Sequence, residues 1–311
     1  MPTPKIDQKY LVEALDLVEE WGSGYLAAKA GVTKLPKNTI ERRAAQARLL
    51  GLRPTHRKDS PRIYQRQRLG RMHLIIPDCQ VKPGVRTDHL EWVGNYIAEK
   101  RPDVVVCIGD FADMESLSKY DVSTLRGENK RLKADLRVAK DAMDRLVKPI
   151  RACKGYKPEM HLTMGNHEDR LSRFANEHPY LEDVIGPHML HYDDWGWKVH
   201  PFTKVVTVDG VEYAHYFITG ESGRPVTSAA ALLRKRHRSA IMGHNQKTDV
   251  AFQPTTHQWA IFCGVCNLHD EVYLGPQGNF VRRQILVLHE VEEGRFDPMF
   301  VSLKFLEKAY S

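Results

Sequence analysis

The sequence lacks long apolar stretches, has few cysteines, and carries no charge excess over most of its length. No uninterrupted apolar run approaches the roughly 18 residues that a membrane-spanning helix needs, so we expect no membrane association. The first residues, MPTPKIDQKY, lack the apolar core of a secretory signal peptide. The five cysteines are an odd number and are scattered, which is typical of free thiols in a reducing compartment. These absences together predict a cytoplasmic protein.

Two of the cysteines, Cys263 and Cys266, form a C-x-x-C pair that has no second pair elsewhere in the chain. A structural zinc ion normally takes four such ligands. The pair is therefore interpreted either as part of a zinc site or, more simply, as two small residues near a strand and a turn.

The charge excess that does exist lies at the N-terminal end of the chain. Residues 1–71 hold 15 of the 46 Lys and Arg residues but only 7 of the 39 Asp and Glu residues, and the rest is almost neutral. A basic module joined to a neutral body is typical of proteins that bind a polyanion. The alternative is a basic arm that only increases solubility.

Three short helices are predicted within this basic region: residues 10–21, 25–30 and 36–50. Asn38 or Thr39 is the predicted N-cap of the third helix. A helix, a turn and a second helix with a basic start resemble a helix-turn-helix module. In that resemblance six polar residues face the DNA major groove: Lys37, Asn38, Thr39, Arg42, Arg43 and Gln46. A plain three-helix bundle with a solvated basic face is the alternative.

We expect the chain to have three parts: a helix-turn-helix-like domain at 1–55, a basic linker at 56–70 and a larger domain at 71–311. In the first half of the larger domain, apolar strands alternate with helices: strands 72–77, 104–108 and 160–164, and helices 87–100 and 126–153. The second half predicts a hairpin, a helix and further strands: 205–217, 228–236, 240–242, 259–265, 284–291 and 299–305. This pattern favours an α/β domain with two mixed sheets.

Five short clusters of metal-binding residue types follow one another along this domain: Asp78-Cys79-Gln80, Gly109-Asp110-Phe111-Ala112-Asp113, Gly165-Asn166-His167-Glu168, His215, and Gly243-His244-Asn245-Gln246. The first three come just after predicted strands. Functional groups of α/β proteins collect at the carboxyl ends of the strands. Carboxylate, amide and imidazole groups together are the donors that a two-metal hydrolytic site uses.

The order and residue types of these clusters resemble the calcineurin-like metallophosphoesterase superfamily. The pattern of that superfamily is D-x-H, G-D-x-x-D/N, G-N-H-D/E, a lone His, and G-H-x-H. The resemblance covers about residues 71–305 and implies a four-layer α/β/β/α sandwich. The chain departs from the pattern at Gln80 and Gln246, where the superfamily usually has His.

The resemblance implies two divalent metal ions and a role for each cluster. The implied ligands are Asp78, Gln80 and Gln246 for the first metal, Asn166, His215 and His244 for the second, and Asp110 as a bridge between both. His167 is implied to protonate the leaving group or to stabilise charge on the phosphoryl oxygens. Asp113 supports the loop or orients His167, and Glu168 supports the ligands without binding metal.

The two Gln residues change the expected metal preference. Their amide oxygens are harder and weaker donors than imidazole nitrogen, so we expect Mn²⁺, or else Mg²⁺, at the first site, with Zn²⁺, Fe and Ni as alternatives. The same change is also compatible with a first metal site that binds its ion only when substrate is present, or with a first site that stays empty. Five basic residues near the clusters are candidates for holding substrate, or else ordinary surface residues: Lys82, Arg86, Arg170, Arg173 and Arg224.

A metallophosphoesterase-like body joined to a basic helical module predicts a phosphodiesterase or nuclease that acts on DNA through a two-metal-activated hydroxide. This combination looks like those found in phage or prophage genomes. One alternative is a phosphatase or cyclic-nucleotide phosphodiesterase for a small substrate, since fold does not decide substrate. Another is a non-enzymatic DNA-binding protein with a weakened metal site.

Overall fold

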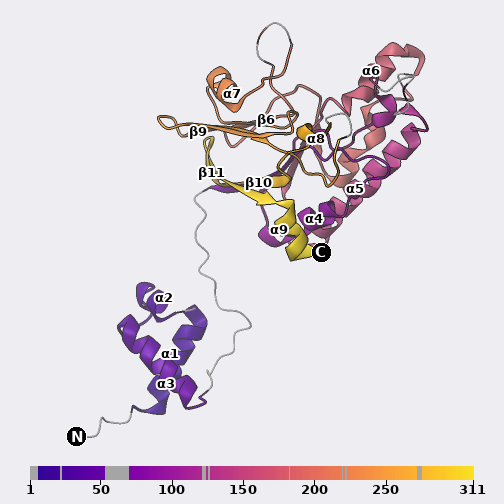
Figure 1. The fold of residues 1–311 in the computed structure, drawn as a ribbon. Coiled ribbons are helices and arrows are strands. Elements are labelled where there is room, and N and C mark those ends of the chain that lie inside the picture. The colour runs from indigo at the N-terminus through magenta and orange to yellow at the C-terminus, as the bar shows by residue number, and fades with distance from the viewer. Residues whose placement is uncertain are drawn as a thin grey trace. The chain divides into compact units, whose positions relative to one another are not determined.

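The computed structural model describes residues 6–21, 23–52, 70–120, 124, 127–181, 183–218, 220, 223–271 and 275–311. The chain divides into two compact units, Met1–Arg68 and Leu69–Ser311, and each has its own apolar core (Figure 1). Apart from Gly70, the predicted basic linker lies outside the described residues. Over the described ranges, no helix is both long enough and apolar enough to span a membrane.

The first unit is built from three helices: α1 (Gln8–Trp21), α2 (Gly24–Lys29) and α3 (Lys37–Leu49). The apolar residues of α1 recur at helical spacing, so Leu11 and Leu15 lie on one face and are buried against Ile40 of α3. The all-α character predicted for this region is confirmed.

The predicted N-caps of the third helix are wrong. Pro36 occupies the N-cap position, with φ −61° and no side-chain cap hydrogen bond, and Asn38 and Thr39 lie in the first turn. The fixed φ of proline suits a helix start, which explains why α3 begins without a polar cap. Ser23 does cap α2, since its side chain accepts a hydrogen bond from the backbone N–H of Leu26 at 3.1 Å.

The second unit contains two sheets. The six-stranded sheet has the order β11-β10-β1-β2-β3-β4, formed by β1 (Arg71–Ile76), β2 (Val104–Cys107), β3 (Glu159–Thr163), β4 (Lys198–His200), β10 (Gln284–Glu292) and β11 (Arg295–Ser302). The five-stranded sheet has the order β5-β6-β7-β9-β8, formed by β5 (Val206–Val208), β6 (Val211–Ala214), β7 (Ala240–Met242), β8 (Thr248–Gln253) and β9 (Gln258–Cys263). Strands β1 to β3 pair in parallel, as do β6, β7 and β9, so their carboxyl ends lie at common edges.

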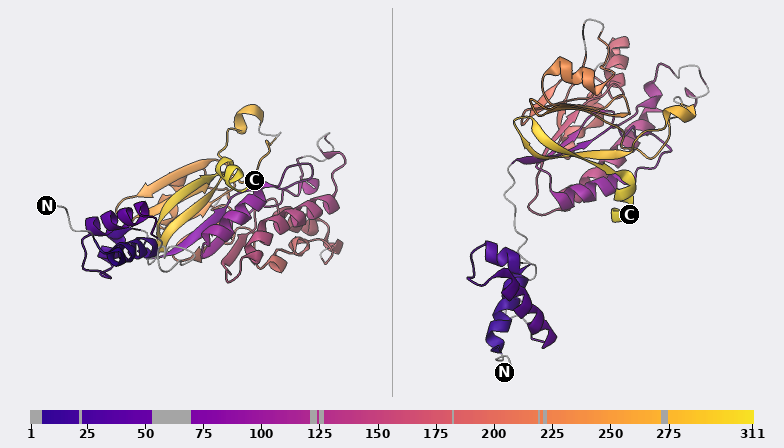
Figure 2. Two further views of the ribbon diagram at one scale, coloured as in Figure 1. Left: turned by 90° about the horizontal axis from the view of Figure 1, so that it is seen from below. Right: turned by 60° about the vertical axis from the view of Figure 1, so that its left-hand side comes forward.

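Helices cover the outer face of each sheet, and the views of Figures 1 and 2 show the resulting layers. The main helices are α4 (His89–Lys100), α5 (Leu132–Ala152), α6 (Asp169–Glu177), α7 (Ala229–Arg236), α8 (Gly275–Gly278) and α9 (Leu303–Tyr310). Helices α4, α5 and α9 share a core with the six-stranded sheet, whereas α7 packs on the five-stranded sheet. Between the sheets, side chains such as Ile75 and Val106 meet Tyr213 and Ile241. The predicted four-layer α/β/β/α sandwich is confirmed.

Two predicted strand ends are wrong in ways that affect the fold. The last predicted strand, 299–305, ends at Ser302, whose side chain caps α9 by accepting a hydrogen bond from the N–H of Phe305. Leu303 and Leu306 then bury one face of that helix. The second strand of the hairpin predicted over 205–217 ends at Ala214, so His215 lies just past a strand end rather than inside a strand.

We predict that Gly94→Ala destabilises the second unit, because α4 and α5 approach closely there. A Cβ atom on Gly94 would lie 2.4 Å from the backbone oxygen of Leu146, so one of the two helices must shift. Overpacking of this kind costs about 1–3 kcal/mol in the free energy of unfolding. Urea unfolding followed by tryptophan fluorescence measures the loss. The exposed change Glu91→Ala on the same helix is the control, with an expected change within about 0.5 kcal/mol.

Candidate metal centre

The predicted ligands come together where the carboxyl ends of both sheets meet. Asp78, Asp110 and Asn166 follow the adjacent parallel strands β1, β2 and β3. His215 and His244 follow the parallel strands β6 and β7 of the other sheet. The centre therefore lies at the seam between the two sheets, with donors from each.

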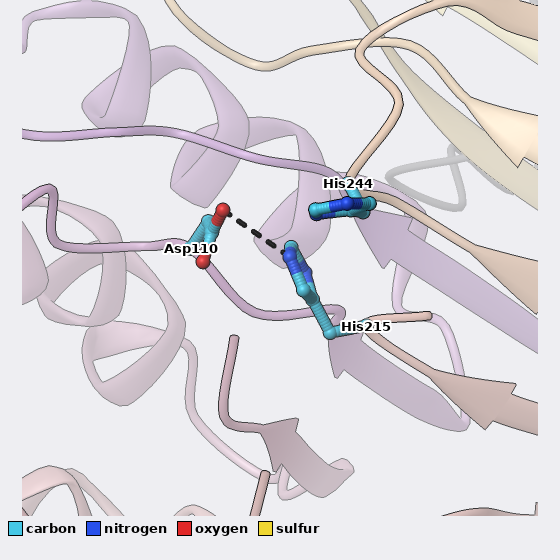
Figure 3. A group of neighbouring side chains, drawn as sticks. All are labelled: Asp110, His215 and His244. Atoms are coloured by element: carbon cyan, nitrogen blue, oxygen red, sulfur yellow. Dashed lines mark ion pairs between the residues drawn. The ribbon is translucent and has the colours of Figure 1, made fainter. Parts of the chain in front are cut away.

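Asp110, His215 and His244 form the core of this centre, and their ligand atoms all lie within 4.8 Å of one another. Figure 3 shows the three side chains converging, with Nε2 of His215 3.2 Å from Oδ2 of Asp110. The Nδ1–H group of His215 donates to the backbone oxygen of Ile108 at 3.0 Å. That bond fixes the ring so that Nε2 faces the centre, as metal-binding histidines require.

Asn166 completes the set implied for the second metal. Its Oδ1 atom lies 2.9 Å from Nε2 of His215 and 2.8 Å from Nδ1 of His244. An amide oxygen, two imidazole nitrogens and the Asp110 carboxylate thus point at one position. This donor set fits a divalent transition metal.

The residues implied for the first metal line the other side of Asp110. The Asp78 carboxylate is buried and accepts the backbone N–H of His244 at 3.1 Å. Gln80 and Gln246 line the same pocket as Asp110. The Oε1 atom of Gln80 is buried without a hydrogen-bond partner among the described residues. A buried acceptor without a donor is costly, and a cation at this position would satisfy it, so the residues present fit a metal ion.

The backbone around the centre is strained. Gln80, Asp110, His244 and Gln246 all have positive φ, at 47°, 48°, 63° and 56°. This left-handed region is unfavourable for residues other than glycine, and such strain collects at functional sites. The surrounding packing therefore imposes these loop shapes.

Two glycines allow the close approach of the loops. A Cβ atom on Gly165 would lie 2.0 Å from Oδ1 of Asp110, and one on Gly243 would lie 2.2 Å from Oδ1 of Asp78. Neither position tolerates a side chain without displacing a predicted ligand. This explains why a glycine precedes Asn166 and His244 in their clusters.

The charges of the centre depend strongly on one another. Burial raises the pKa of Asp78 to about 7, with Asp110 adding to the rise. Burial alone would raise the pKa of Asp110, but His167 and His215 outweigh it and hold the pKa below its usual range. Burial lowers the pKa of His215, but the attraction of the Asp110 carboxylate outweighs burial and raises that pKa to about 9. For His244 burial and His215 together lower the pKa to about 4.

His167 and Asp113 form a pair beside Asp110. Nδ1 of His167 lies 2.7 Å from Oδ1 of Asp113, and its Nε2 lies 3.7 Å from Oδ2 of Asp110. Asp113 therefore contacts His167 directly, in the arrangement expected of a residue that orients it. Burial opposes protonation of His167, but Asp110 and then Asp113 outweigh it and raise its pKa.

Glu168 connects the loops that follow β2 and β3. Its fully buried carboxylate accepts three backbone N–H groups, from Asp110 and Ala112 at 3.0 Å each and from Gly165 at 2.9 Å. It lies behind the ligands rather than among them, as the sequence implied.

A pocket of about 770 Å³ opens over the centre and includes residues that the sequence did not suggest. The unexpected lining residues include Glu115, Tyr120, Lys130, His269, Asp270 and Glu271. Two of the five basic candidates, Lys82 and Arg170, also line it. Three of them, His269, Asp270 and Glu271, form a run of ligand-type residues shortly after the C-x-x-C pair, and this run is the signal by which the sequence could have indicated them.

The other basic candidates are not among the described residues that line the pocket. Arg86 pairs with Asp88. Arg173 pairs with Asp169 and donates to the backbone oxygen of Asn166 at 2.6 Å, so it supports the loop of a predicted ligand. Arg224 is exposed and is not among the described lining residues. The cysteine pair is buried, and all five cysteines are free thiols. Within the described residues, no His, Cys, Asp or Glu group besides Asp110, His215 and His244 has metal-binding spacing, so the zinc interpretation of the cysteine pair gains no support.

In the N-terminal unit, the six predicted DNA-contacting residues lie along the first three turns of α3. Lys37, Asn38, Arg42 and Gln46 are exposed, and Thr39 and Arg43 are half-buried. The guanidinium of Arg43 lies over the ring of Tyr10, 5.7 Å from its centroid. A polar, basic face of α3 is thus accessible to a ligand.

Relatives of this chain occur in mycobacteriophages. The Gene 54 protein of Mycobacterium phage D29 is 27% identical over 192 residues, which are 60% of this chain and 71% of that protein. The Gene 54 protein of Mycobacterium phage L5 is 26% identical over 186 residues, which are 57% of this chain and 69% of that protein.

Solved structures with a related arrangement include Vps29 from Entamoeba histolytica complexed with Zn²⁺. It is 11% identical, covers 75% of this chain and 99% of its own, and has a TM-score of 0.34. A double mutant of Vps29 from the same organism is 12% identical, covers 74% of this chain and 98% of its own, and has a TM-score of 0.33. At these TM-scores the likeness adds no weight to any conclusion about this chain.

The model of the calcineurin-like phosphoesterase family matches residues 72–276, which include all five clusters. This match covers more than half of the sequence and lies within the two-sheet unit that carries the metal centre. The chain belongs to the calcineurin-like phosphoesterase family.

Proposed function

We propose that this protein is a metal-dependent phosphodiesterase that cuts DNA. The observation that carries the proposal is the convergence of ligand-type side chains from both sheets. The ligand atoms of Asp110, His215 and His244 lie within 4.8 Å of one another, and an open pocket over them is also lined by Gln80, Asn166 and Gln246. A phosphoesterase family supplies the reaction class. The separate basic helical unit supports DNA as the substrate.

Two divalent ions would be held by the side chains at the seam. The second site would suit a first-row transition metal, with the ligands Asn166, His215, His244 and Asp110. The first site would favour Mn²⁺ or Mg²⁺, because Asp78 is joined there by the amide oxygens of Gln80 and Gln246. When bound, such ions neutralise phosphate charge and lower the pKa of bound water. The chain itself fixes where these donors lie, through the strained loops and the Glu168 hydrogen bonds.

We expect His167 to donate a proton to the leaving oxygen. Its Nδ1 atom is bound to Asp113, so its Nε2 atom faces the pocket beside Asp110. The carboxylates on both sides favour the protonated ring. A positioned acid of this kind contributes typically about 10²–10⁴-fold to a rate.

The charge of the pocket wall favours a phosphodiester over a phosphomonoester. Beyond the predicted ligands, the described lining residues include the cations Lys82, Lys130 and Arg170, and each is paired with a carboxylate. The wall carries four carboxylates against these three cations: Asp113, Glu115, Asp270 and Glu271. A diester brings one negative charge into this wall, whereas a monoester at neutral pH brings nearly two, which the carboxylates repel.

The first prediction concerns Asp110. Asp110→Asn removes the negative charge that both ligand groups share, so we expect Mn²⁺-stimulated hydrolysis of bis-(p-nitrophenyl) phosphate to fall by about 10³-fold or more. Metal-stripped protein with Mn²⁺ added back is assayed, and electron paramagnetic resonance measures bound Mn²⁺. Asp297→Asn, an exposed change on β11, is the control and keeps full activity. Equal metal-stimulated rates for Asp110→Asn and wild type would contradict the proposal.

The second prediction concerns the ester class. At pH 8, where a phosphomonoester is a dianion, we expect kcat/KM for bis-(p-nitrophenyl) phosphate to exceed that for p-nitrophenyl phosphate by at least about tenfold. The preference should narrow toward pH 5, where the monoester loses its second charge. A preference for the monoester at pH 8 would instead indicate a phosphatase.

The third prediction concerns the basic helix. We expect the double variant Lys37→Ala/Arg42→Ala to bind duplex DNA more weakly than wild type. The slope of log K against log salt concentration should also become shallower, by about one unit for each phosphate that is no longer neutralised. Fluorescence anisotropy with labelled DNA measures both quantities, and turnover of the small diester should stay unchanged. Lys9→Ala, an exposed basic change on α1, is the matched control. DNA affinity that is the same in the double variant and wild type would remove α3 as the DNA-binding surface.

A further inference from the structure

A continuous chain of charged side chains leads from His167 to the far wall of the pocket. Asp113 lies 2.7 Å from Nδ1 of His167 through Oδ1 and 3.1 Å from Nζ of Lys82 through Oδ2. Nζ of Lys82 also lies 2.8 and 2.7 Å from the two carboxylate oxygens of Glu271. His269 ends the chain, with Nε2 2.8 Å from Oε1 of Glu271. Segments after β1, β2, β3 and β9 are thus joined by contacts that the family pattern of metal ligands does not include.

These linked side chains are buried, and Glu271 is held in place by further hydrogen bonds. The exposed fractions of the side chains are 15% for Lys82, 8% for Asp113 and 4% for Glu271. The backbone N–H of Glu271 donates to Oδ1 of Asn279 at 2.8 Å, and Nδ2 of Asn279 donates back to the oxygen of Glu271 at 2.9 Å. The desolvation of a buried ion pair offsets much of its attraction, but losing one partner is costly because it leaves a lone buried charge.

This arrangement argues against a substrate-binding role for Lys82. Its ammonium group is shared between two carboxylates, so little of its charge remains to attract a phosphate. What Lys82 does determine is the orientation of Asp113. With Oδ2 bound to Lys82 and Oδ1 bound to Arg170 at 3.1 Å, the carboxylate has one orientation in which Oδ1 meets the ring of His167.

We propose that Lys82 and Glu271 are positioning residues, which hold Asp113, and through it the ring of His167, in the orientation that proton donation requires. The inference rests on the proposed role of His167 in protonating the leaving oxygen. Glu271 acts indirectly, because it binds the ammonium group of Lys82, which in turn binds Asp113, from the opposite wall of the pocket. Neither side chain touches the substrate phosphate.

The leaving group provides a readout that a purely structural role would not change. Proton donation matters most when the leaving oxygen is strongly basic. The p-nitrophenyl and phenyl esters of thymidine 5′-phosphate differ only in the nitro group, and phenolate is the more basic leaving group. A misplaced His167 should therefore slow the phenyl ester much more than the p-nitrophenyl ester.

The experiment compares kcat and KM for both esters in wild type, Glu271→Gln, Lys82→Met and His167→Gln, all with saturating Mn²⁺. For Glu271→Gln and Lys82→Met we expect kcat on the phenyl ester to fall about tenfold and kcat on the p-nitrophenyl ester to fall less than about threefold, with KM unchanged. His167→Gln should show the same selectivity with a larger loss. Adding Glu271→Gln to His167→Gln should cause no further loss, because both act through one ring.

Two controls separate positioning from folding. Glu212→Gln removes a buried carboxylate from an ion pair with the partly exposed Arg236, away from the pocket, and it should not distinguish the esters. The double variant Lys82→Met/Glu271→Gln removes both charges of the pair. Selective loss on the phenyl ester in that variant, at wild-type melting temperature, assigns the effect to positioning.

Four outcomes would contradict the inference, and they differ in what they imply for the proposed function. Equal losses on both esters, or a Glu271→Gln effect that persists undiminished in the His167→Gln background, would overturn the inference. A selective loss on the phenyl ester that appears in His167→Gln but not in Glu271→Gln or Lys82→Met would also overturn the inference, and it would leave the proposed function intact. No selectivity in His167→Gln would overturn the role of His167 itself, and the inference with it.

Discussion

The metal centre depends on one buried carboxylate that binds no metal in the proposed scheme. Glu168 accepts the backbone N–H groups of Asp110, Ala112 and Gly165, and thereby ties the loop after β2 to the loop after β3. Burial and the nearby Asp110 raise the pKa of Glu168, and the N–H donors of Ala112 and Gly165, together with His215, oppose that rise. Removing it would leave three buried donors without an acceptor, each a substantial cost.

Other features of the centre follow from this constraint. With its backbone N–H bound to Glu168, Asp110 takes a left-handed turn, and its Oδ1 accepts the N–H of His167 at 2.9 Å. Its Oδ2 then faces His215, which arrives from the other sheet. The two sheets thus meet through side chains whose positions the backbone has already fixed. A cation held there by Asp110 and His215 would connect layers that otherwise contact each other mainly through apolar packing.

Much of this organisation could be predicted from the sequence because local signals and chemistry agreed. Apolar runs followed by a ligand-type residue predicted the strand ends that carry Asp78, Asp110 and Asn166, with a glycine directly before the last two. Short apolar runs do not separate strand from helix, which is why the start of α9 was mistaken for part of a strand. The Lys82–Glu271 pair could not be predicted, because nothing local indicates which acidic residue will lie opposite a lysine 189 positions earlier.

The two Gln residues are best understood through the backbone that presents them. Asn, Asp and His tolerate positive φ better than most residues, whereas Gln has no special preference for it. Gln80 and Gln246 nevertheless adopt φ of 47° and 56°, so the loops, rather than the side chains, determine the turns. A His-to-Gln difference in such loops changes the donor atom while leaving its place largely unchanged. The orphaned Oε1 of Gln80 agrees with this interpretation, because it remains in a buried position that only a cation or a donor would stabilise. The physical expectation is therefore a centre with altered metal preference rather than one that has lost the capacity to bind.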